Sequence, residues 1–354
     1  MASGTPSPSP SPSDARAYAR AAATNNLCGD FVRAARAMDY AIPLPEGQLT
    51  TFTRSKPGRP PAPVHVLCET LDLDESQPRP PAADDNNGDF LFVRPIPPAT
   101  MDSWLQEVQP CASSVFGQMC QRDQGDRPID FAESLIAHLD RWLSCDKGDL
   151  RPDGPGFDKR GLFGKTKWRT TKIRHPWFGP TEEEILKGCY YMATYRFDYG
   201  ATRRTATSPR GFTETPHIVG TCAHSVQQLP EQGLLRGEID AIIIMTQVRR
   251  MPPCCVSFRA VPVTVISVAR NDVRILHAYV DTQKRLIKVR KSRVLNFDNI
   301  DDIHAGNDEW KHILRWVLAE PDMDTVRATG YFDVDQPGSK AQQPSLLRKA
   351  LAHR

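Results

Sequence analysis

The sequence predicts an α+β protein, in which an antiparallel three-stranded meander is packed by several amphipathic helices and preceded by a disordered, Pro-rich N-terminal extension. Three observations predict this fold class. Apolar runs separated by short polar links occupy residues 261–291, apolar residues recur at helical spacing elsewhere, and 17 of the 31 prolines lie in the first 110 residues. Links this short join antiparallel neighbours, and clustered prolines disfavour regular structure.

The first 99 residues are predicted to form two segments. Residues 1–13 are dominated by alternating Ser and Pro and cannot bury a core, so this arm is expected to be disordered. Residues 14–99 are expected to form an irregular, Pro-rich extension with short helices. This extension includes an acidic loop over 69–89 and an edge strand over 89–94.

The main α+β domain is expected over 100–335, followed by a flexible basic tail over 336–354. Helices are predicted over 130–145, 181–197 and 308–320, because each stretch carries apolar residues on one helical face or a capping signal at its start. In the first two, Asp or Thr precedes Glu by three residues, which is the spacing of a capping box.

The central strands are predicted over 261–268, 273–280 and 285–291. The stretch 234–248 before them is apolar and contains three consecutive Ile residues, so its sequence is compatible with a helix or a strand. The three strands are expected to form the meander at the centre of the domain.

The composition indicates a protein of a reducing compartment. The chain has nine cysteines, an odd number, without C-x-x-C spacing, which favours free thiols over disulfides. The N-terminus has no apolar signal segment, and no window holds 18 apolar residues. We therefore expect a cytoplasmic or nuclear protein that is not secreted and has no membrane partner.

The most distinctive segment is 158–178, with seven Lys and Arg residues against one acidic residue and with interleaved aromatic rings. Cations that follow phosphates and rings that stack on bases are typical of single-strand nucleic-acid binding. A second basic cluster spans 284–293. The alternatives are a solvated loop anchored by its tryptophans, and an ordinary exposed sheet face. The residues assigned to nucleic-acid binding are Lys159, Arg160, Lys165, Lys167, Trp168, Arg169, Lys172, Arg174, Lys288 and Arg290.

A helix with an acid, followed by a meander carrying Asp, is also the outline of restriction-endonuclease-like nucleases. Under this alternative Glu238, Asp240 and Asp281 supply carboxylates for Mg²⁺, and Lys288 supplies the catalytic cation. Val289 stands where the second carboxylate of the motif belongs, so a divergent or decayed relative is expected rather than an active nuclease. No cofactor other than this Mg²⁺ is expected.

His217, Cys222 and His224 form the tightest group of metal-ligating residue types in the sequence. Structural zinc sites usually combine two close pairs of ligands. The sequence offers no second pair beside this group, so a chance cluster in a polar loop is the favoured interpretation.

The block 262–297 combines an apolar strand, a second strand that ends in Tyr-x-Asp, and a basic third strand. Together with the residues from 234 onward, this block resembles a family of filamentous-fungal proteins with no assigned activity. The resemblance covers less than a fifth of the chain and implies no catalytic residue.

These observations favour a non-enzymatic intracellular binding protein that engages nucleic acid through 158–178. One alternative is the metal-dependent nuclease-like enzyme. Another is a protein-interaction or regulatory factor that works through its disordered N-terminus, where Ser-Pro dipeptides are potential phosphorylation sites.

Overall fold

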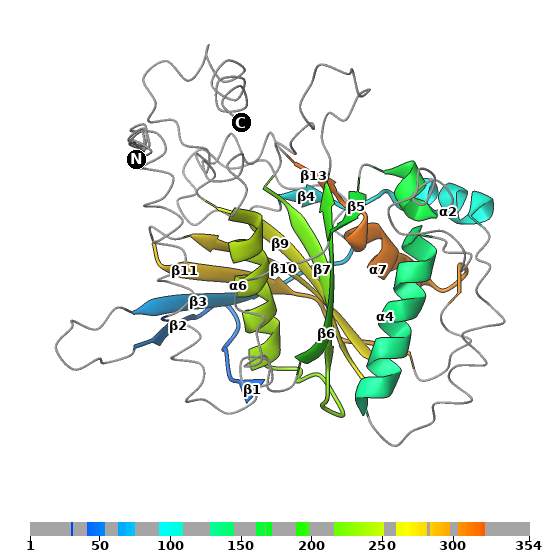
Figure 1. Ribbon diagram of the computed structural model, residues 1–354. Coiled ribbons are helices and arrows are strands. Elements are labelled where there is room, and N and C mark those ends of the chain that lie inside the picture. The colour runs from blue at the N-terminus through cyan, green and yellow to red at the C-terminus, as the bar shows by residue number, and fades with distance from the viewer. Residues whose placement is uncertain are drawn as a thin grey trace, which may run out of the picture.

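A mixed nine-stranded sheet with helices on both faces dominates the described part of the chain (Figure 1). The combination of a large sheet with separate helices confirms the α+β class. The computed structural model describes residues 30, 41–53, 63–74, 92–108, 128–144, 161–166, 168–171, 189–197, 216–250, 260–281, 284–297 and 304–322.

The strands of the sheet follow the order β2-β3-β11-β10-β9-β7-β6-β5, and β12 pairs with β10 outside this path. Their bounds are β2 Leu49–Phe52, β3 Val64–Thr70, β5 Trp168–Thr171, β6 Cys189–Phe197, β7 Ile218–His224, β9 Pro262–Ala269, β10 Asp272–Asp281, β11 Leu286–Lys291 and β12 Leu295–Asn296. The pairs β3–β11 and β7–β9 are parallel, and the other pairs are antiparallel.

The three strands expected over 261–291 are β9, β10 and β11, which pair antiparallel in chain order. They do not stand alone, because β7 joins β9 and β3 joins β11, each in parallel. Parallel strands need long crossover connections, which the spacing of neighbouring apolar runs does not reveal.

The segment before residue 100 contributes to this same sheet. Its strands β2 and β3 form an antiparallel pair, and Val64, Val66 and Cys68 of β3 are fully buried. The boundary expected at residues 99 and 100 therefore does not separate these strands from the main sheet. The Ser/Pro arm, most of the acidic loop and the basic tail lie outside the described residues.

The short strand β1 (Ala41–Ile42) pairs with β8 (Leu234–Leu235). Gly233 makes this close approach feasible, because an added Cβ would lie 2.2 Å from the carbonyl oxygen of Ile42. Its φ of +77° is also readily adopted only by glycine.

Two expected helices are present as α4 (Pro128–Ser144) and α7 (Asp308–Val317). The side chain of Asn307 caps α7 by accepting a 3.0 Å hydrogen bond from the Trp310 backbone N–H. The ambiguous stretch 234–248 forms β8 and then α6 (Arg236–Arg250). The remaining elements are α2 Pro98–Glu107, the 3₁₀ helix η2 Leu162–Lys165, β4 Val93–Arg94 and β13 Glu320–Pro321.

The helix predicted over 181–197 is wrong for its described half, because residues 189–197 form β6. Tyr, Thr and Phe make up most of this stretch, and these residue types fit a pleated sheet well. β6 lies between β5 and β7. Pairing on both sides therefore outweighs the capping signal of the preceding sequence.

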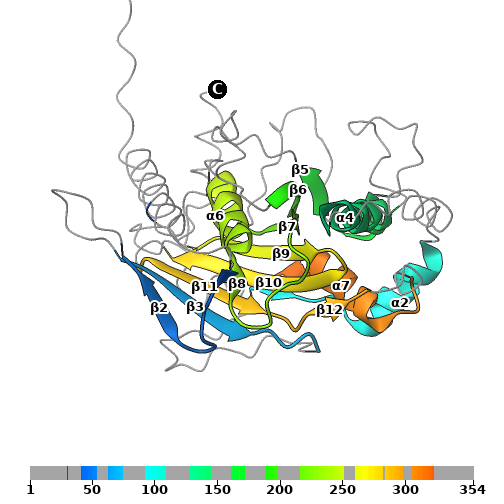
Figure 2. The ribbon, with the colours of Figure 1, turned by 90° about the horizontal axis from the view of Figure 1, so that it is seen from below.

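The helices divide the core into two layers. Buried side chains of α6 pack on one face of the sheet, and those of α4, α7 and α2 pack on the other. Figure 2 shows α4, α7 and α2 gathered together, apart from α6. Across the described ranges, no helix combines the length and the apolar character needed to cross a membrane.

Candidate functional site

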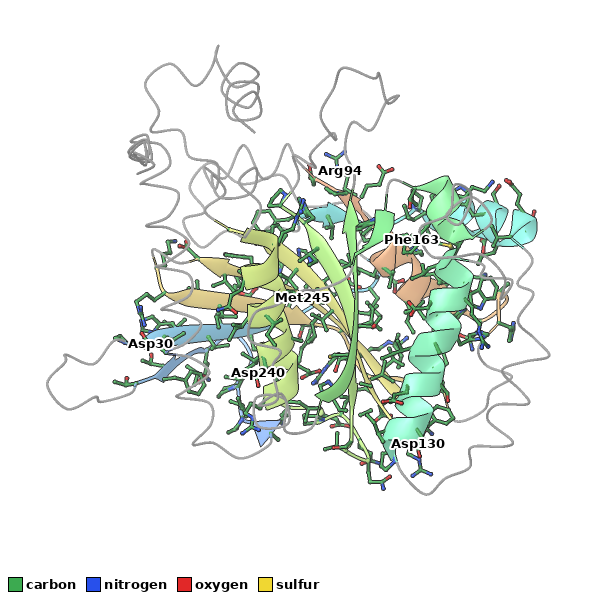
Figure 3. The ribbon with its side chains drawn as sticks, in the orientation of Figure 1. Asp30, Arg94, Asp130, Phe163, Asp240 and Met245 are labelled. Carbon is green, nitrogen blue, oxygen red and sulfur yellow. The ribbon has the colours of Figure 1, made fainter. Side chains whose placement is uncertain are left out.

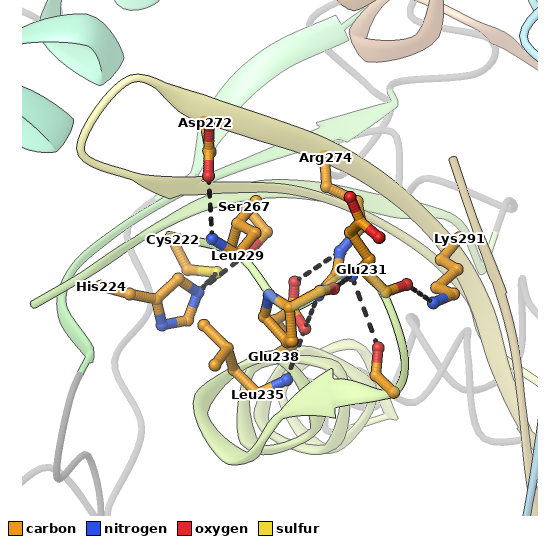
Figure 4. Close-up of polar contacts among 12 residues, drawn as sticks. Cys222, His224, Leu229, Glu231, Leu235, Glu238, Ser267, Asp272, Arg274 and Lys291 are labelled. Carbon is orange, nitrogen blue, oxygen red and sulfur yellow. Dashed lines mark hydrogen bonds and ion pairs between the residues drawn. The ribbon is translucent and has the colours of Figure 1, made fainter. Parts of the chain in front are cut away.

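Five polar side chains from three strands and one helix meet at the start of α6 (Figure 4). α6 follows β7 and precedes its parallel neighbour β9, so the helix begins at the carboxyl ends of both strands. Ligands of open α/β sheets bind preferentially at this end. We call this group the polar cluster; its members are Cys222, His224, Glu238, Ser267 and Arg274.

The centre of the polar cluster is an ion pair between Glu238 of α6 and Arg274 of β10. Arg274 donates through Nε to Glu238 Oε1 at 3.1 Å and through Nη2 to Oε2 at 2.6 Å. The side chains are only 1% and 0% exposed, respectively. Burial alone raises the pKa of Glu238, but the guanidinium of Arg274, the nearby His224 and hydrogen bonds from Arg274 and Ser267 bring the pKa below its usual value. Glu238 is therefore a buried carboxylate that is held ionised.

His224 connects the ion pair to a thiol. Its Nε2 lies 3.0 Å from Ser267 Oγ and 3.2 Å from Cys222 Sγ, and Ser267 is in turn hydrogen-bonded to Glu238. A thiol, an imidazole, a hydroxyl and a carboxylate thus form one hydrogen-bonded network. Cys222, His224 and Ser267 are also fully buried, so the network offers a substrate no surface. Its contacts join the start of α6 to β9 and β10 of the sheet.

The connection between β7 and α6 is hydrogen-bonded to side chains of β10, of β11 and of the link between β9 and β10. Arg274 donates from Nη1 to the carbonyl oxygen of Pro230 at 2.8 Å, and Lys291 donates to the carbonyl oxygen of Glu231 (Figure 4). Asp272 accepts from the backbone N–H of Leu229 at 3.0 Å, and Arg270 donates to Gln227 at 3.1 Å. Residues of β10, of β11 and of the β9–β10 link therefore fix this connection beside the polar cluster.

The carboxylates proposed for a nuclease do not gather around one ion position. Glu238 contacts β10 at Arg274, whereas Asp281 lies seven residues further along that strand, about 23 Å away, with its side chain on the opposite face. Asp240 is buried on α6 (Figure 3). It is two positions from Glu238, so the two side chains point about 200° apart around the helix. Mg²⁺ needs ligands at about 2.1 Å and cannot bridge these groups.

Lys288 lies on the face of β11 that points away from α6. The hydrophobic side chains of Ile287 and Val289 pack in the α6 layer, as the alternation along the strand predicts. Lys288 and Arg290 instead approach the same carboxylate, Glu69 of β3, at 3.0 and 3.4 Å. Both are buried, so the interpretation of an exposed basic sheet face is wrong.

The candidate metal ligands are only partly brought together. Cys222 and His224 belong to the polar cluster, but His217 lies before β7 and donates from Nε2 to the carbonyl oxygen of Phe92 at 2.7 Å. His217 and His224 lie seven positions apart along an extended chain, so their side chains are on opposite faces. Within the described ranges, no three His, Cys, Asp or Glu side chains are grouped as a metal site requires.

The basic segment 158–178 is described only over η2 and β5. Trp168 is fully buried and donates its indole N–H to the carbonyl oxygen of Ala319 at 3.1 Å, so its ring cannot stack on a base. Phe163 is buried beside α4 (Figure 3). Lys165 forms an ion pair with Glu107. The side chains of Lys159, Arg160, Lys167, Arg169, Lys172 and Arg174 lie outside the described part of the structure.

The sequence did not identify Ser267 or Arg274 as members of a site. Arg274 carried one signal, because it is a charged residue inside the apolar run 273–280. A buried Arg needs a buried partner, and Glu238 is one of the acidic residues in an otherwise apolar stretch before it. Ser267 carried none, since Ser is unremarkable in a strand.

Comparisons with known proteins do not assign the polar cluster. No protein-family model matches the chain, and neither the curated proteins nor the solved structures contain a significant match. Any functional proposal for this chain therefore depends on its own residues.

Proposed function

We propose that this chain is a non-enzymatic binding protein that contacts the phosphates of nucleic acid through the basic segment 158–178. The observation that carries the proposal is the excess of seven Lys and Arg residues over one acidic residue in 21 positions, in a chain whose net charge is only +3. Charge concentrated in this way attracts a polyanion without a strongly basic whole.

The place of β5 in the fold supports this proposal. β5 is the last strand of the sheet order, so residues 168–171 run along a sheet edge. The buried Trp168 anchors that strand to the core beneath it. A strand fixed in this manner is a rigid base for the cations on either side, which favours repeated phosphate contacts.

The burial of Trp168 and Phe163 changes the expected mode of binding. Base stacking contributes about 1–3 kcal/mol for each base on an exposed ring. Since two of the four rings in the segment are buried, we expect binding to be governed by phosphate contacts, with strong salt dependence and little preference among sequences.

The non-enzymatic part of the proposal is supported by the state of the candidate carboxylates. The negative charge of Glu238 is balanced by the ion pair with Arg274, and Asp281 lies at the other end of β10. A decayed nuclease-like ancestry agrees with this arrangement, but Mg²⁺-dependent cleavage does not. Labelled strands should therefore stay intact with Mg²⁺.

The test is fluorescence anisotropy with a labelled 20-nucleotide single strand, titrated with the full chain at 50 and 200 mM salt. The test variant replaces Arg160, Lys172 and Arg174 by Gln. The control variant replaces Arg54, Lys56 and Arg59 by Gln; these are also two Arg and one Lys, and they lie outside both basic clusters.

We expect the test variant to lose at least tenfold in affinity. Its log–log salt slope should fall by about 2, since each phosphate contact to a single strand contributes about 0.7. The control variant should bind nearly as the wild type does. Equal losses in both variants, or no binding by the wild type at 50 mM salt, would contradict the proposal.

A further inference from the structure

The backbone of Phe92, just before β4, is held between two buried histidines. His217 Nε2 lies 2.7 Å from the carbonyl oxygen of Phe92, and the Phe92 N–H points to His277 Nε2 at 3.4 Å, at the long end of hydrogen-bond distances. The backbone N–H of Asp322, after β13, donates to the same carbonyl oxygen at 2.8 Å. β4 and β13 pair only with each other, so these contacts help to hold the small sheet on the large one.

The hydrogen-bond roles fix the protonation of both rings. His277 accepts the Phe92 N–H at Nε2, so its proton must be on Nδ1, which lies 3.2 Å from Thr264 Oγ1. His217 faces a carbonyl oxygen with Nε2, so its proton must be on Nε2. Its Nδ1 is buried and has no hydrogen-bond partner. The two histidines therefore have to be neutral, and in opposite tautomers.

Protonation of either ring conflicts with these contacts. A proton on His277 Nε2 would oppose the N–H of Phe92, and a proton on His217 Nδ1 would be a buried donor without an acceptor. The charges nearby are mostly cationic: Arg290 of β11 acts on His277, and Arg249 of α6 acts on His217. Among the described residues, the carboxylate that acts on His217 is Asp322, which already forms a 2.8 Å ion pair with Arg94.

Trp316 of α7 also lies beside His277, with ring centres 6.4 Å apart, and His217 is a second titratable group that acts on His277. Burial, and then these cations, lower the pKa of His217 and of His277 to about 3 in the folded protein, from 6.5. Both rings are thus neutral at physiological pH, in agreement with their hydrogen-bond roles.

We propose that His217, His277 and the Phe92 backbone form an acid-sensitive latch that fastens β4 and β13 to the main sheet. Residues 75–91 lead into this latch and residues 323–354 follow it, so it sets the points at which both segments leave the described core. The inference does not depend on nucleic-acid binding.

The direction of the pH effect follows from linkage. When the latch opens, both imidazoles regain an ordinary affinity for protons, so the open state is favoured as pH falls below 6.5. The closed latch is fully stable above that value. At pH 5 the opening equilibrium should rise by about 30-fold for each histidine, and about 1,000-fold for both, since each pH unit below 6.5 contributes about tenfold.

The first measurement tests the tautomers directly, by ¹H–¹⁵N correlation of histidine side chains in the full chain at pH 7. We expect His277 to carry its proton on Nδ1 and His217 on Nε2. A charged ring at pH 7, or the same tautomer at both positions, would overturn the proposal. This result does not depend on any variant folding.

The second measurement is hydrogen exchange of the Phe92 and Asp322 amides between pH 7.5 and 5, corrected for the intrinsic exchange rate. Their protection should fall about 1,000-fold, and it should remain below that of the Ile266 amide in β9. His277→Gln keeps an acceptor for Phe92 and a donor for Thr264 but does not titrate, so its protection should fall only about 30-fold. The control His304→Gln, in an exposed turn, should behave as the wild type. Protection that does not change with pH, or that equals that of Ile266 throughout, would refute the latch.

Discussion

The strongest stability prediction concerns the buried pair of Glu238 and Arg274. Replacing Arg274 by Met keeps much of the side-chain volume but removes the guanidinium. A carboxylate with no exposed surface then remains, without the two charge-assisted hydrogen bonds at 3.1 and 2.6 Å. Breaking a buried pair in this way costs about 3–5 kcal/mol. We expect the free energy of unfolding to fall by about 4 kcal/mol. Ser267 and the Leu235 N–H still donate to Glu238 in the variant, whereas the carbonyl oxygen of Pro230 loses its donor.

The assay is urea unfolding at pH 7, followed by far-UV circular dichroism. The matched control is Arg293→Met, because Arg293 also lies 2.6 Å from a carboxylate, that of Glu309. Those two side chains are 59% and 34% exposed, so their pair should contribute less than about 1 kcal/mol. Equal losses in the two variants would refute the reasoning that burial, rather than distance, sets the cost.

The double variant Arg274→Met with Glu238→Leu tests the same reasoning from the other side. An apolar pair leaves no unpaired charge, so part of the lost stability should return. Recovery should be incomplete, because the Leu235 N–H loses its acceptor and the Pro230 carbonyl oxygen loses a donor. The pH dependence has a fixed sign: Glu238 has a lowered pKa in the folded state, so the pair stabilises the fold above the usual carboxyl pKa of 4.5. Without Arg274, burial raises the pKa of Glu238 above its usual value, so the difference in stability between wild type and Arg274→Met should narrow as pH falls, beginning above 4.5.

Three further predictions follow from single positions. Gly233→Ala should destabilise the fold by more than about 3 kcal/mol, because its φ is +77° and the new Cβ would meet the Ile42 carbonyl oxygen. The control Gly47→Ala, at φ +69° with no atom within 4 Å of the new Cβ, should cost only about 1 kcal/mol. Equal shifts of the melting temperature in the two variants would contradict this. Trp168→Ala should lower the free energy of unfolding by about 3–5 kcal/mol in urea, because the side chain is fully buried. The folded variant should keep its salt-dependent binding of nucleic acid. Loss of binding without loss of stability would instead favour the stacking interpretation. Burial raises the pKa of the Cys68 thiol to about 11, so Cys68 should resist alkylation at pH 8 in the native protein and react in urea; rapid native labelling would contradict its placement.

The parts of the fold that could be predicted are those with local signals. β9, β10 and β11 are apolar runs with short links, and the stripe of Trp310, Ile313 and Leu314 marks α7. The strand β6 was not predictable in the same way, because its neighbours β5 and β7 come from segments on either side of it. Its strand state is fixed by pairing, which a local capping signal cannot indicate.

The candidate site was predictable only as separate residues. Glu238 was predicted as a nuclease carboxylate, whereas Cys222 and His224 were predicted as metal ligands, and the structure joins them through Ser267 and Arg274. Arg274 is 36 positions from Glu238, so no spacing rule relates them. In the basic segments, the residue types of Trp168, Lys288 and Arg290 indicated a binding surface, but the structure buries all three side chains.

The parallel pairing of β3 with β11 also has a consequence for folding during synthesis of the chain on the ribosome. His65 is paired with Leu286, so about 220 residues must be synthesised before β3 meets its central neighbour. At about 5–20 residues per second, this delay lasts about 10–40 s. During that time Val64, Val66 and Cys68 have only the short hairpin partner β2 to cover them.

An apolar strand that waits so long without its neighbour is a natural target for chaperones and for wrong pairing on the ribosome. Moving β3 to follow β11, by circular permutation, would shorten the wait without changing a contact in the folded sheet. The native order therefore leaves β3 without its central neighbour during much of the synthesis of the chain.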